Sequence, residues 1–219
     1  MNRDNLKVAF YTLGCKVNQY ETQALKDDFT RHGFSIGDEH GKADIYVINT
    51  CTVTNLADRK SRQYIRKMKK LNPESIIAVI GCYAQVSPHE AAAIDGVDLV
   101  LGNNEKNSLP DYVESLIRER QESQQEDNKA GNGMNSPFVR ILKREELSEY
   151  EESGIITTME SRTRALIKIQ DGCDQFCSYC IIPYARGPIR SRPAREIIKE
   201  AESLIEKGFK ELILTGINT

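Results

Sequence analysis

The stretch Ile169-Gln-Asp-Gly-Cys-Asp-Gln-Phe-Cys-Ser-Tyr-Cys-Ile-Ile-Pro183 brings three cysteines together, Cys173, Cys177 and Cys180. Three and then two residues separate these thiols. A structural zinc site prefers four protein ligands, and a thioredoxin-like redox pair needs only two. Thiolates are the usual ligands of four-iron clusters, so the spacing favours an iron-sulfur cube with one corner free of protein ligands. A zinc knuckle completed by a distant ligand is the alternative.

The segments around this loop are typical of one unit of a β/α barrel. Residues 165–170 predict a strand that leads into the cysteines, and residues 194–207 predict a helix with one apolar face. Residues 211–215 predict the next strand. The cysteines then follow the first strand, at the end where barrel enzymes keep their chemistry. We expect residues 164–219 to form only the first part of a barrel that is truncated here.

The first 121 residues alternate between predicted strands and helices. Buried strands are expected at 7–13, 44–49, 76–80 and 97–101, and helices at about 20–32, 55–71, from Ser87 onward, and at 108–121. This alternation predicts an α/β domain, an open parallel sheet with helices on both faces. Residues 122–163 are expected to be a linker and connecting segment, because 122–137 are rich in Gln, Glu, Asn, Ser and Gly.

The other three cysteines each follow a predicted strand directly. They are Cys15, Cys51 and Cys82. Ligands of an open parallel sheet bind outside the carboxyl ends of its strands, so these thiols are expected at one edge. We interpret them as a second three-thiolate site. Ordinary buried cysteines are the alternative. Three disulfides are a poor account of six cysteines in a reducing compartment.

Composition limits the location and the partners. No apolar run approaches membrane-spanning length, and the first residues lack the features of a signal peptide, so we expect a cytoplasmic protein without a membrane partner. The net charge of -2 gives no general attraction to nucleic acid. An RNA contact would need a local patch, and the expected second helix offers one; a solvated helix face is the alternative. The basic residues of this patch are Arg59, Lys60, Arg62, Arg66, Lys67, Lys69 and Lys70.

The two cysteine groups and their surroundings resemble the methylthiotransferases, a family of radical S-adenosylmethionine (SAM) enzymes. The N-terminal matches lie at residues 12–18, 49–54 and 81–85, and the radical-domain matches lie at 172–187 and 190–192. The resemblance covers nearly the whole chain. It implies a methylthiotransferase N-terminal domain followed by a radical SAM barrel. Most of that barrel, and an RNA-binding TRAM domain after it, are absent from this sequence.

The resemblance also implies roles for the cysteines. Cys173, Cys177 and Cys180 would hold the radical SAM 4Fe-4S cluster, SAM would chelate its open iron, and Tyr179 would lie against the adenine. Cys15, Cys51 and Cys82 would hold an auxiliary 4Fe-4S cluster that carries the sulfur to be inserted. One SAM would methylate that sulfur and another would supply the radical. An electron donor such as flavodoxin or ferredoxin is implied as a partner.

Residues 13–22 most resemble the branch of the family called MtaB. That branch adds a methylthio group at C2 of N6-threonylcarbamoyladenosine, beside the anticodon in tRNA, so the resemblance implies the tRNA anticodon stem-loop as a partner. Other branches act on isopentenyladenosine in tRNA or on an aspartate of a ribosomal protein, and an inactive fragment is a further alternative. Arg186, Arg190 and Arg192 could bind a substrate phosphate or the SAM carboxylate, or could form salt bridges.

Overall fold

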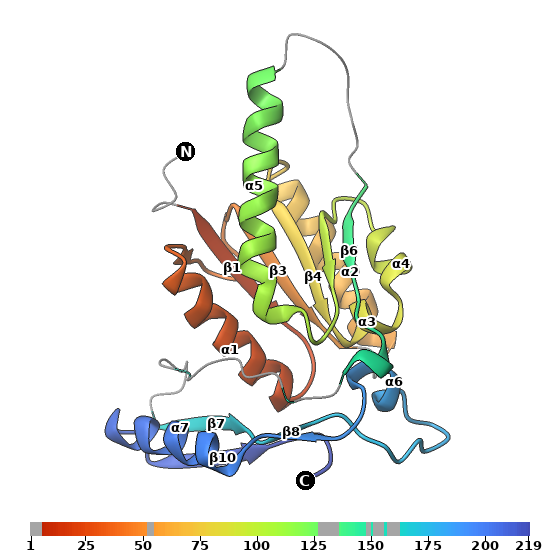
Figure 1. Ribbon diagram of the computed structural model, residues 1–219. Helices are drawn as coiled ribbons and strands as arrows, with labels where there is room; N and C mark the ends of the chain where they lie inside the picture. Colours follow the sequence, from red (N-terminus) through yellow and green to blue (C-terminus); the bar gives the residue numbers. More distant parts are fainter. Residues whose placement is uncertain (1–5, 52–54, 127–135, 148–149, 151–155, 157–162) are drawn as a thin grey trace.

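The computed structural model describes residues 6–51, 55–126, 136–147, 150, 156 and 163–219. Its first part is a parallel sheet with the strand order β2-β1-β3-β4-β5-β6 (Figure 1). The expected α/β class with an open parallel sheet is therefore confirmed. The strands are β1 (Lys7–Thr12), β2 (Ser35–Ile36), β3 (Ile45–Thr50), β4 (Ile76–Gly81), β5 (Leu99–Leu101) and β6 (Phe138–Arg140).

Helices cover both faces of this sheet, because successive side chains of a strand point to opposite sides. In β4, Ile76, Ala78 and Ile80 join the core under one layer of helices, and Ile77 and Val79 join the core under the other. The first layer contains α1 (Lys16–Arg31) and α5 (Leu109–Glu126), and the second contains α2 (Asn55–Leu71), α3 (Cys82–Val86) and α4 (Pro88–Ala92). A strand that is apolar at every position, as β4 is, fits this double burial.

The structure corrects several expected boundaries. Helix α1 begins at Lys16 rather than near Tyr20, so Cys15 stands at its N-cap position. The helix expected from Ser87 is α4, and a separate short helix, α3, precedes it. The last helix of this part, α5, continues to Glu126. Edge strands β2 and β6 were not expected, and β6 lies inside the segment taken as a connection.

The second part of the chain forms one β/α unit. Strands β7 (Arg164–Lys168) and β10 (Glu211–Thr215) pair in parallel, and α7 (Ala194–Glu206) connects them and packs through Leu204 on Ala165 and Ile167. Between β7 and α7 lie β8 (Gln170–Asp171), the cysteine loop, α6 (Ile182–Arg186) and β9 (Arg190–Ser191). The expected start of a β/α barrel is therefore present.

Helix α1 belongs to both parts of the molecule. Its residues Leu25 and Phe29 pack on the six-stranded sheet, whereas Tyr20 and Ala24 pack with Leu166 of β7. In Figure 1 the second part lies below the N-terminal part, next to the first turns of α1 and beside α3. The two parts therefore meet at the carboxyl ends of the sheet strands, where the first three cysteines lie.

Candidate metal centre

The strand-end group of cysteines, Cys15, Cys51 and Cys82, lies along one edge of the sheet. Strands β1, β3 and β4 are neighbours and parallel, and each cysteine stands just beyond the carboxyl end of one of them. The Cys15 side chain is exposed, Cys51 is half-buried and Cys82 is buried. Among the described residues, no three His, Cys, Asp or Glu side chains stand close enough together to hold a metal ion. The ligand role of this group stays a prediction.

Two asparagines connect the strand ends that carry these thiols. The Asn18 side-chain amide donates to the carbonyl oxygens of Leu13 (2.9 Å) and Thr50 (3.0 Å), which flank Cys15 and Cys51. The Asn49 amide donates to the Asn18 carbonyl oxygen (3.1 Å) and to the Thr22 hydroxyl (3.1 Å). The turns after β1 and β3 are thus joined by side-chain hydrogen bonds as well as by the sheet.

Gly81 lets the third turn approach as closely. Its φ of +95° is a conformation that residues with a Cβ rarely adopt. A Cβ at this position would lie 2.5 Å from the Thr50 carbonyl oxygen and 2.6 Å from the Asn49 Oδ1 atom. Glycine is therefore required where the chain passes from β4 to Cys82.

The surroundings of this group suit thiolate sulfur. The Asn103 amide nitrogen donates to the Cys82 sulfur over 3.6 Å, and the Cys15 thiol lies 3.6 Å from the Asn18 Oδ1 atom that accepts its proton. The Cys82 thiolate also helps to raise the pKa of Arg186. A hydrogen-bond donor and a buried cation are what an anionic sulfur ligand needs in a site of low dielectric. The donor set therefore fits a thiolate-bound iron-sulfur cluster.

The loop group, Cys173, Cys177 and Cys180, follows β8. The Cys173 amide donates to the Gly187 carbonyl oxygen (3.0 Å), and the Cys180 amide donates to the Cys177 carbonyl oxygen (2.9 Å). These bonds curl the loop so that it begins and ends beside the same short helix, α6. Cys173 and Cys180 are half-buried and Cys177 is exposed, so the sulfurs are open to a ligand from outside.

The residue before the first cysteine of this loop must be glycine. Gly172 has a φ of +74°, and a Cβ there would overlap the Pro188 carbonyl oxygen. Asp174 fastens the next turn, because it accepts from the Ile189 amide (3.1 Å) and forms an ion pair with Arg144. Arg144 belongs to the connecting segment before β7, so this segment helps to shape the cysteine loop.

The Tyr179 side chain is 90% exposed at the tip of the loop. An exposed ring is available to stack on a planar ligand, and its contact with adenine stays a prediction.

The three arginines after the loop are buried, which favours the salt-bridge interpretation of their role. Arg186 pairs with Glu21 (2.9 Å) and Asp171 (3.0 Å), and Arg192 pairs with Glu200. Arg190 donates to the Arg186 carbonyl oxygen over 2.6 Å. Side chains engaged in this way inside the protein do not reach outward to a substrate phosphate.

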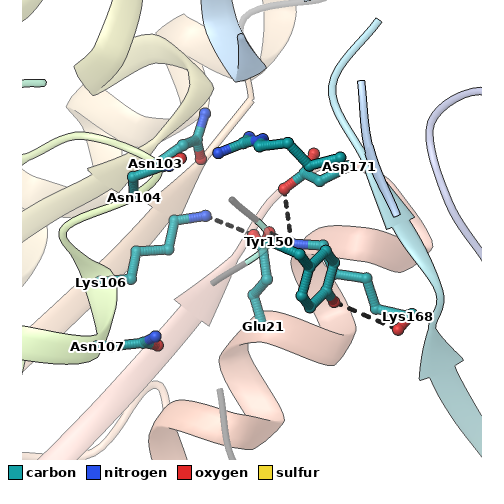
Figure 2. Close-up of a pocket in the computed structure, with 9 residues that line it drawn as sticks. Glu21, Asn103, Asn104, Lys106, Asn107, Tyr150, Lys168 and Asp171 are labelled. Atoms are coloured by element: carbon teal, nitrogen blue, oxygen red, sulfur yellow. Dashed lines mark hydrogen bonds and ion pairs between the residues drawn. The ribbon is translucent and has the colours of Figure 1, made fainter. Parts of the chain in front are cut away.

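Five buried charged side chains meet where the two parts of the chain join, and we call them the buried charge cluster. Glu21 of α1 lies at the centre, and Figure 2 shows Lys106 and Lys168 reaching toward it from opposite sides. The cavity that they line has a volume of about 20 Å³, which is room for a water molecule rather than for a substrate. The members of the cluster are Glu21, Lys106, Lys168, Asp171 and Arg186.

Charge pairing sets the protonation states in this cluster. Burial alone would raise the pKa of Glu21, but Arg186, Lys106 and Lys168 hold it well below its ordinary value. Burial would also raise the pKa of Asp171, and Arg186 and Lys168 lower it to about 2. Both carboxylates are therefore ionised at neutral pH, and each has a cation within ion-pair distance.

The sequence gave only weak signals for this cluster. Lys168 interrupts an otherwise apolar strand, and Glu21 lies in the stretch around Cys15 that carries the family resemblance. A polar residue within a buried strand indicates either a buried partner or an exposed face. The pattern alone could not decide between these, because the partners of Lys168 lie up to 147 residues away along the chain.

The basic patch on α2 divides into two kinds of residue. Arg62 donates to the Tyr83 hydroxyl (2.7 Å), and Lys69 donates to the Ser75 carbonyl oxygen (2.8 Å), so both help to hold the fold. The other five side chains are exposed, and they remain candidates for an RNA contact. These are Arg59, Lys60, Arg66, Lys67 and Lys70.

Two family models match this chain. The model of the uncharacterized protein family UPF0004 matches residues 7–102, which hold the strand-end group, and the model of the radical SAM superfamily matches residues 167–219, which hold the loop group. The chain is 47% identical over 212 residues to the threonylcarbamoyladenosine tRNA methylthiotransferase MtaB of Bacillus subtilis, covering 97% of the chain and 44% of that relative. This chain belongs to the methylthiotransferase family of radical SAM proteins.

Other relatives of this methylthiotransferase family member carry two different names. An Aquifex aeolicus protein, also named MtaB, is 40% identical over 96% of the chain and 48% of its own length. A Pelagibacter ubique protein named tRNA-2-methylthio-N(6)-dimethylallyladenosine synthase is 30% identical over 97% of the chain and 45% of its own length. The chain spans about half the length of these curated relatives. In the part of the chain that the structure describes, no helix has the length and apolar character to cross a membrane.

The charge state of Glu21 should make the stability of the chain depend on pH. Glu21 keeps its proton off in the folded chain until the pH is well below its ordinary value of 4.5, whereas the unfolded chain binds the proton near that value. Its stabilising effect is therefore present above about pH 4.5 and is lost as the pH falls through the folded value. We expect Glu21→Gln to lower the free energy of unfolding by roughly 3–5 kcal/mol at pH 7 and by much less near pH 3.

Denaturant unfolding at a series of pH values measures this difference. Glu74→Gln removes a carboxylate from an exposed position and serves as the control, which should show no such trend. A gap between wild type and Glu21→Gln that stayed constant from pH 7 to pH 3 would show that the ion pairs of Glu21 do not stabilise the fold.

Proposed function

We propose that this protein is a radical SAM methylthiotransferase that adds a methylthio group to C2 of N6-threonylcarbamoyladenosine, next to the anticodon in tRNA. The observation that carries the proposal is the juxtaposition of two groups of three cysteines in a chain that matches both family models. Helix α6, which directly follows the loop group, packs against α3, which begins with Cys82 of the strand-end group. The named modification comes from the relatives called MtaB, which are 47% and 40% identical to this chain.

We assign one 4Fe-4S cluster to each cysteine group. Three thiolates leave one iron of a four-iron cube without a protein ligand, so each cluster keeps a position for a further ligand. With SAM bound, the cluster of the loop group supplies one-electron chemistry strong enough to act on an unreactive C–H bond. The residues of this chain hold and insulate the two clusters, and Tyr179 stacks on the SAM adenine.

The partners follow from this assignment. A cluster that donates single electrons needs a small electron-transfer protein such as flavodoxin or ferredoxin to recharge it. The tRNA anticodon stem-loop is the substrate, and the cytoplasm is where such a tRNA and such a donor meet. Further parts of the barrel and a TRAM domain complete the enzyme in our proposal, since this chain spans about half the length of its relatives.

The exposed cations of α2 support the choice of an RNA substrate. Helix α2 begins four residues after Cys51, and its exposed side chains Arg59 and Lys60 lie in the turns nearest that cysteine. Arg66, Lys67 and Lys70 continue the exposed series toward the far end of the helix. Cations placed on a helix that starts at the metal edge can neutralise phosphates of a stem whose loop reaches the clusters.

Reversing two of these charges should weaken RNA binding through the phosphate contacts alone. We expect the variant Arg66→Glu/Lys67→Glu to bind the anticodon stem-loop more weakly and to lose roughly one to two units of the salt slope, about one for each phosphate contact. Filter binding at several salt concentrations measures this. The control Arg195→Glu/Lys199→Glu makes the same change of net charge at exposed positions on α7 and should leave the slope nearly unchanged. Equal slopes in the two variants would leave α2 as a solvated helix face.

Replacing one cysteine should remove one cluster and spare the other. We expect about eight irons per chain after anaerobic reconstitution of the wild type, because each cube contains four irons. Cys15→Ala and Cys173→Ala should each retain about four, and a variant that carries both changes should retain almost none. Iron and sulfide analysis gives these counts, and absorbance near 400 nm follows each cluster. A Cys15→Ala protein that still bound eight irons would remove Cys15 from the ligand set.

Mass spectrometry of tRNA nucleosides tests the proposed function itself. Cells without this gene should lose the methylthio group from threonylcarbamoyladenosine, and the full reading frame should restore it. Loss from isopentenyladenosine instead would assign the protein to the activity named for the Pelagibacter ubique relative. An unchanged tRNA would contradict the proposal and direct attention to the aspartate of a ribosomal protein. Complementation with residues 1–219 alone tells whether this chain is active or an inactive fragment.

A further inference from the structure

One short helix connects the two cysteine groups directly. Helix α6 begins at Ile182, two residues after Cys180, and ends at Arg186. It packs against α3, whose first residue is Cys82. The Asn103 side chain seals this contact, because its amide nitrogen donates both to the Ala185 carbonyl oxygen and to the Cys82 sulfur. A displacement of α6 would therefore be felt at Cys82.

The last residue of α6 reaches the other two cysteine turns. Arg186 has a side chain that is completely buried, and its Nη2 atom donates to the Asn18 Oδ1 atom over 2.6 Å. Asn18 in turn donates to the carbonyl oxygens of Leu13 and Thr50. These two carbonyl groups flank Cys15 and Cys51, so one side chain from the radical SAM part is linked to the turns of both thiols.

The same Asn18 oxygen also accepts from the Cys15 thiol. When Cys15 gives up its proton to become a metal ligand, this oxygen loses one donor. Arg186 remains bonded to it and keeps the Asn18 side chain in place. The remaining guanidinium nitrogen, Nη1, is held by Glu21 (2.9 Å) and Asp171 (3.0 Å), so the fork cannot turn away.

We propose that Arg186 is a positioning residue: it holds the strand-end group of cysteines in a fixed arrangement relative to the loop group by bridging Asn18 with Glu21 and Asp171. The proposal rests on the proposed function, because it assumes that both groups bind metal clusters. A planar fork that bonds three partners fixes orientation as well as distance, which a lysine at this position could not do.

Arg192 provides a matched control for a purely structural role. It is also a buried arginine of the radical SAM part, it also reaches α1, and it pairs with Glu200 and lies 3.4 Å from the Tyr20 hydroxyl. Its printed partners do not flank a cysteine. If buried arginines at this interface act only by stabilising the fold, Arg186 and Arg192 should behave alike.

The first experiment isolates the strand-end cluster in the 219-residue chain. Cys173, Cys177 and Cys180 are replaced by alanine, and the protein is reconstituted anaerobically with iron and sulfide. The electron paramagnetic resonance spectrum of the reduced protein and the rate of iron loss to a chelator are then compared for Arg186→Gln, Arg186→Lys and Arg192→Gln. We expect Arg186→Gln to shift the spectrum and to lose iron at least tenfold faster, Arg186→Lys to be intermediate, and Arg192→Gln to match the parent.

The second experiment does not depend on metal. Hydrogen exchange of the metal-free chain reports local opening of the cysteine turns. We expect residues 13–18 and 49–51 to exchange at least tenfold faster in Arg186→Lys than in Arg192→Gln, even where the two variants unfold at the same denaturant concentration. If Arg186→Gln fails to fold, Arg186→Lys carries both comparisons.

The two experiments separate failure of this inference from failure of the proposed function. A parent protein that binds no iron would contradict the proposed function, and hydrogen exchange would still test the link from Arg186 to the cysteine turns. A parent with a cluster whose spectrum, iron loss and local exchange respond equally to changes at Arg186 and Arg192 would overturn the positioning role.

Discussion

The carboxylate of Glu21 receives a cation from each of three distant segments, and the arrangement of the two parts of the molecule depends on these contacts. Lys106 comes from the short 3₁₀ helix before α5, Lys168 from β7 and Arg186 from α6. Removing a charge from water costs several kcal/mol, and only close partners offset that cost. Any other packing of α1 against the radical SAM part would leave a buried charge without its partner. The buried charge cluster therefore selects one relative position of the two parts.

Apolar packing at the same boundary would be less selective. The hydrophobic effect depends on the area removed from water and has little directional preference. In this boundary, Tyr20, Ala24, Ile156 and Leu166 form a small apolar core that could tolerate sliding. The hydrogen bonds of Arg186 and Arg192 have fixed directions and resist it. A boundary that carries a metal-binding group on each side needs that second kind of contact.

Much of the N-terminal fold could be predicted because its central strands are apolar along their full length. The strands near Phe10, Ile48 and Val79 have a strong local signal, and so do the glycines that end two of them. Strands β2 and β6 were missed because their side chains are exposed and each strand has at most three residues. Their pairing with β1 and β5 is a tertiary interaction, and no local pattern encodes it.

The candidate site shows the same limit. Spacing and strand ends located all six cysteines and predicted that three of them share an edge, because the carboxyl ends of parallel strands must meet there. The sequence could not tell which arginine or lysine is buried. Arg186 and Arg66 are chemically alike, yet one has no exposed side-chain surface and the other lies on the surface. Only the three-dimensional position of Glu21 and Asp171 separates them.

The charges of the cluster connect its structural role to the chemistry of the cysteines. Its five residues comprise three cations and two carboxylates, so one positive charge remains after pairing. The Cys82 thiolate helps to raise the pKa of both Arg186 and Lys106, which places that sulfur within electrostatic reach of the surplus charge. A buried cation favours the ionised form of a neighbouring thiol. The contacts that fix the two parts in place thus also favour Cys82 in the state that binds metal.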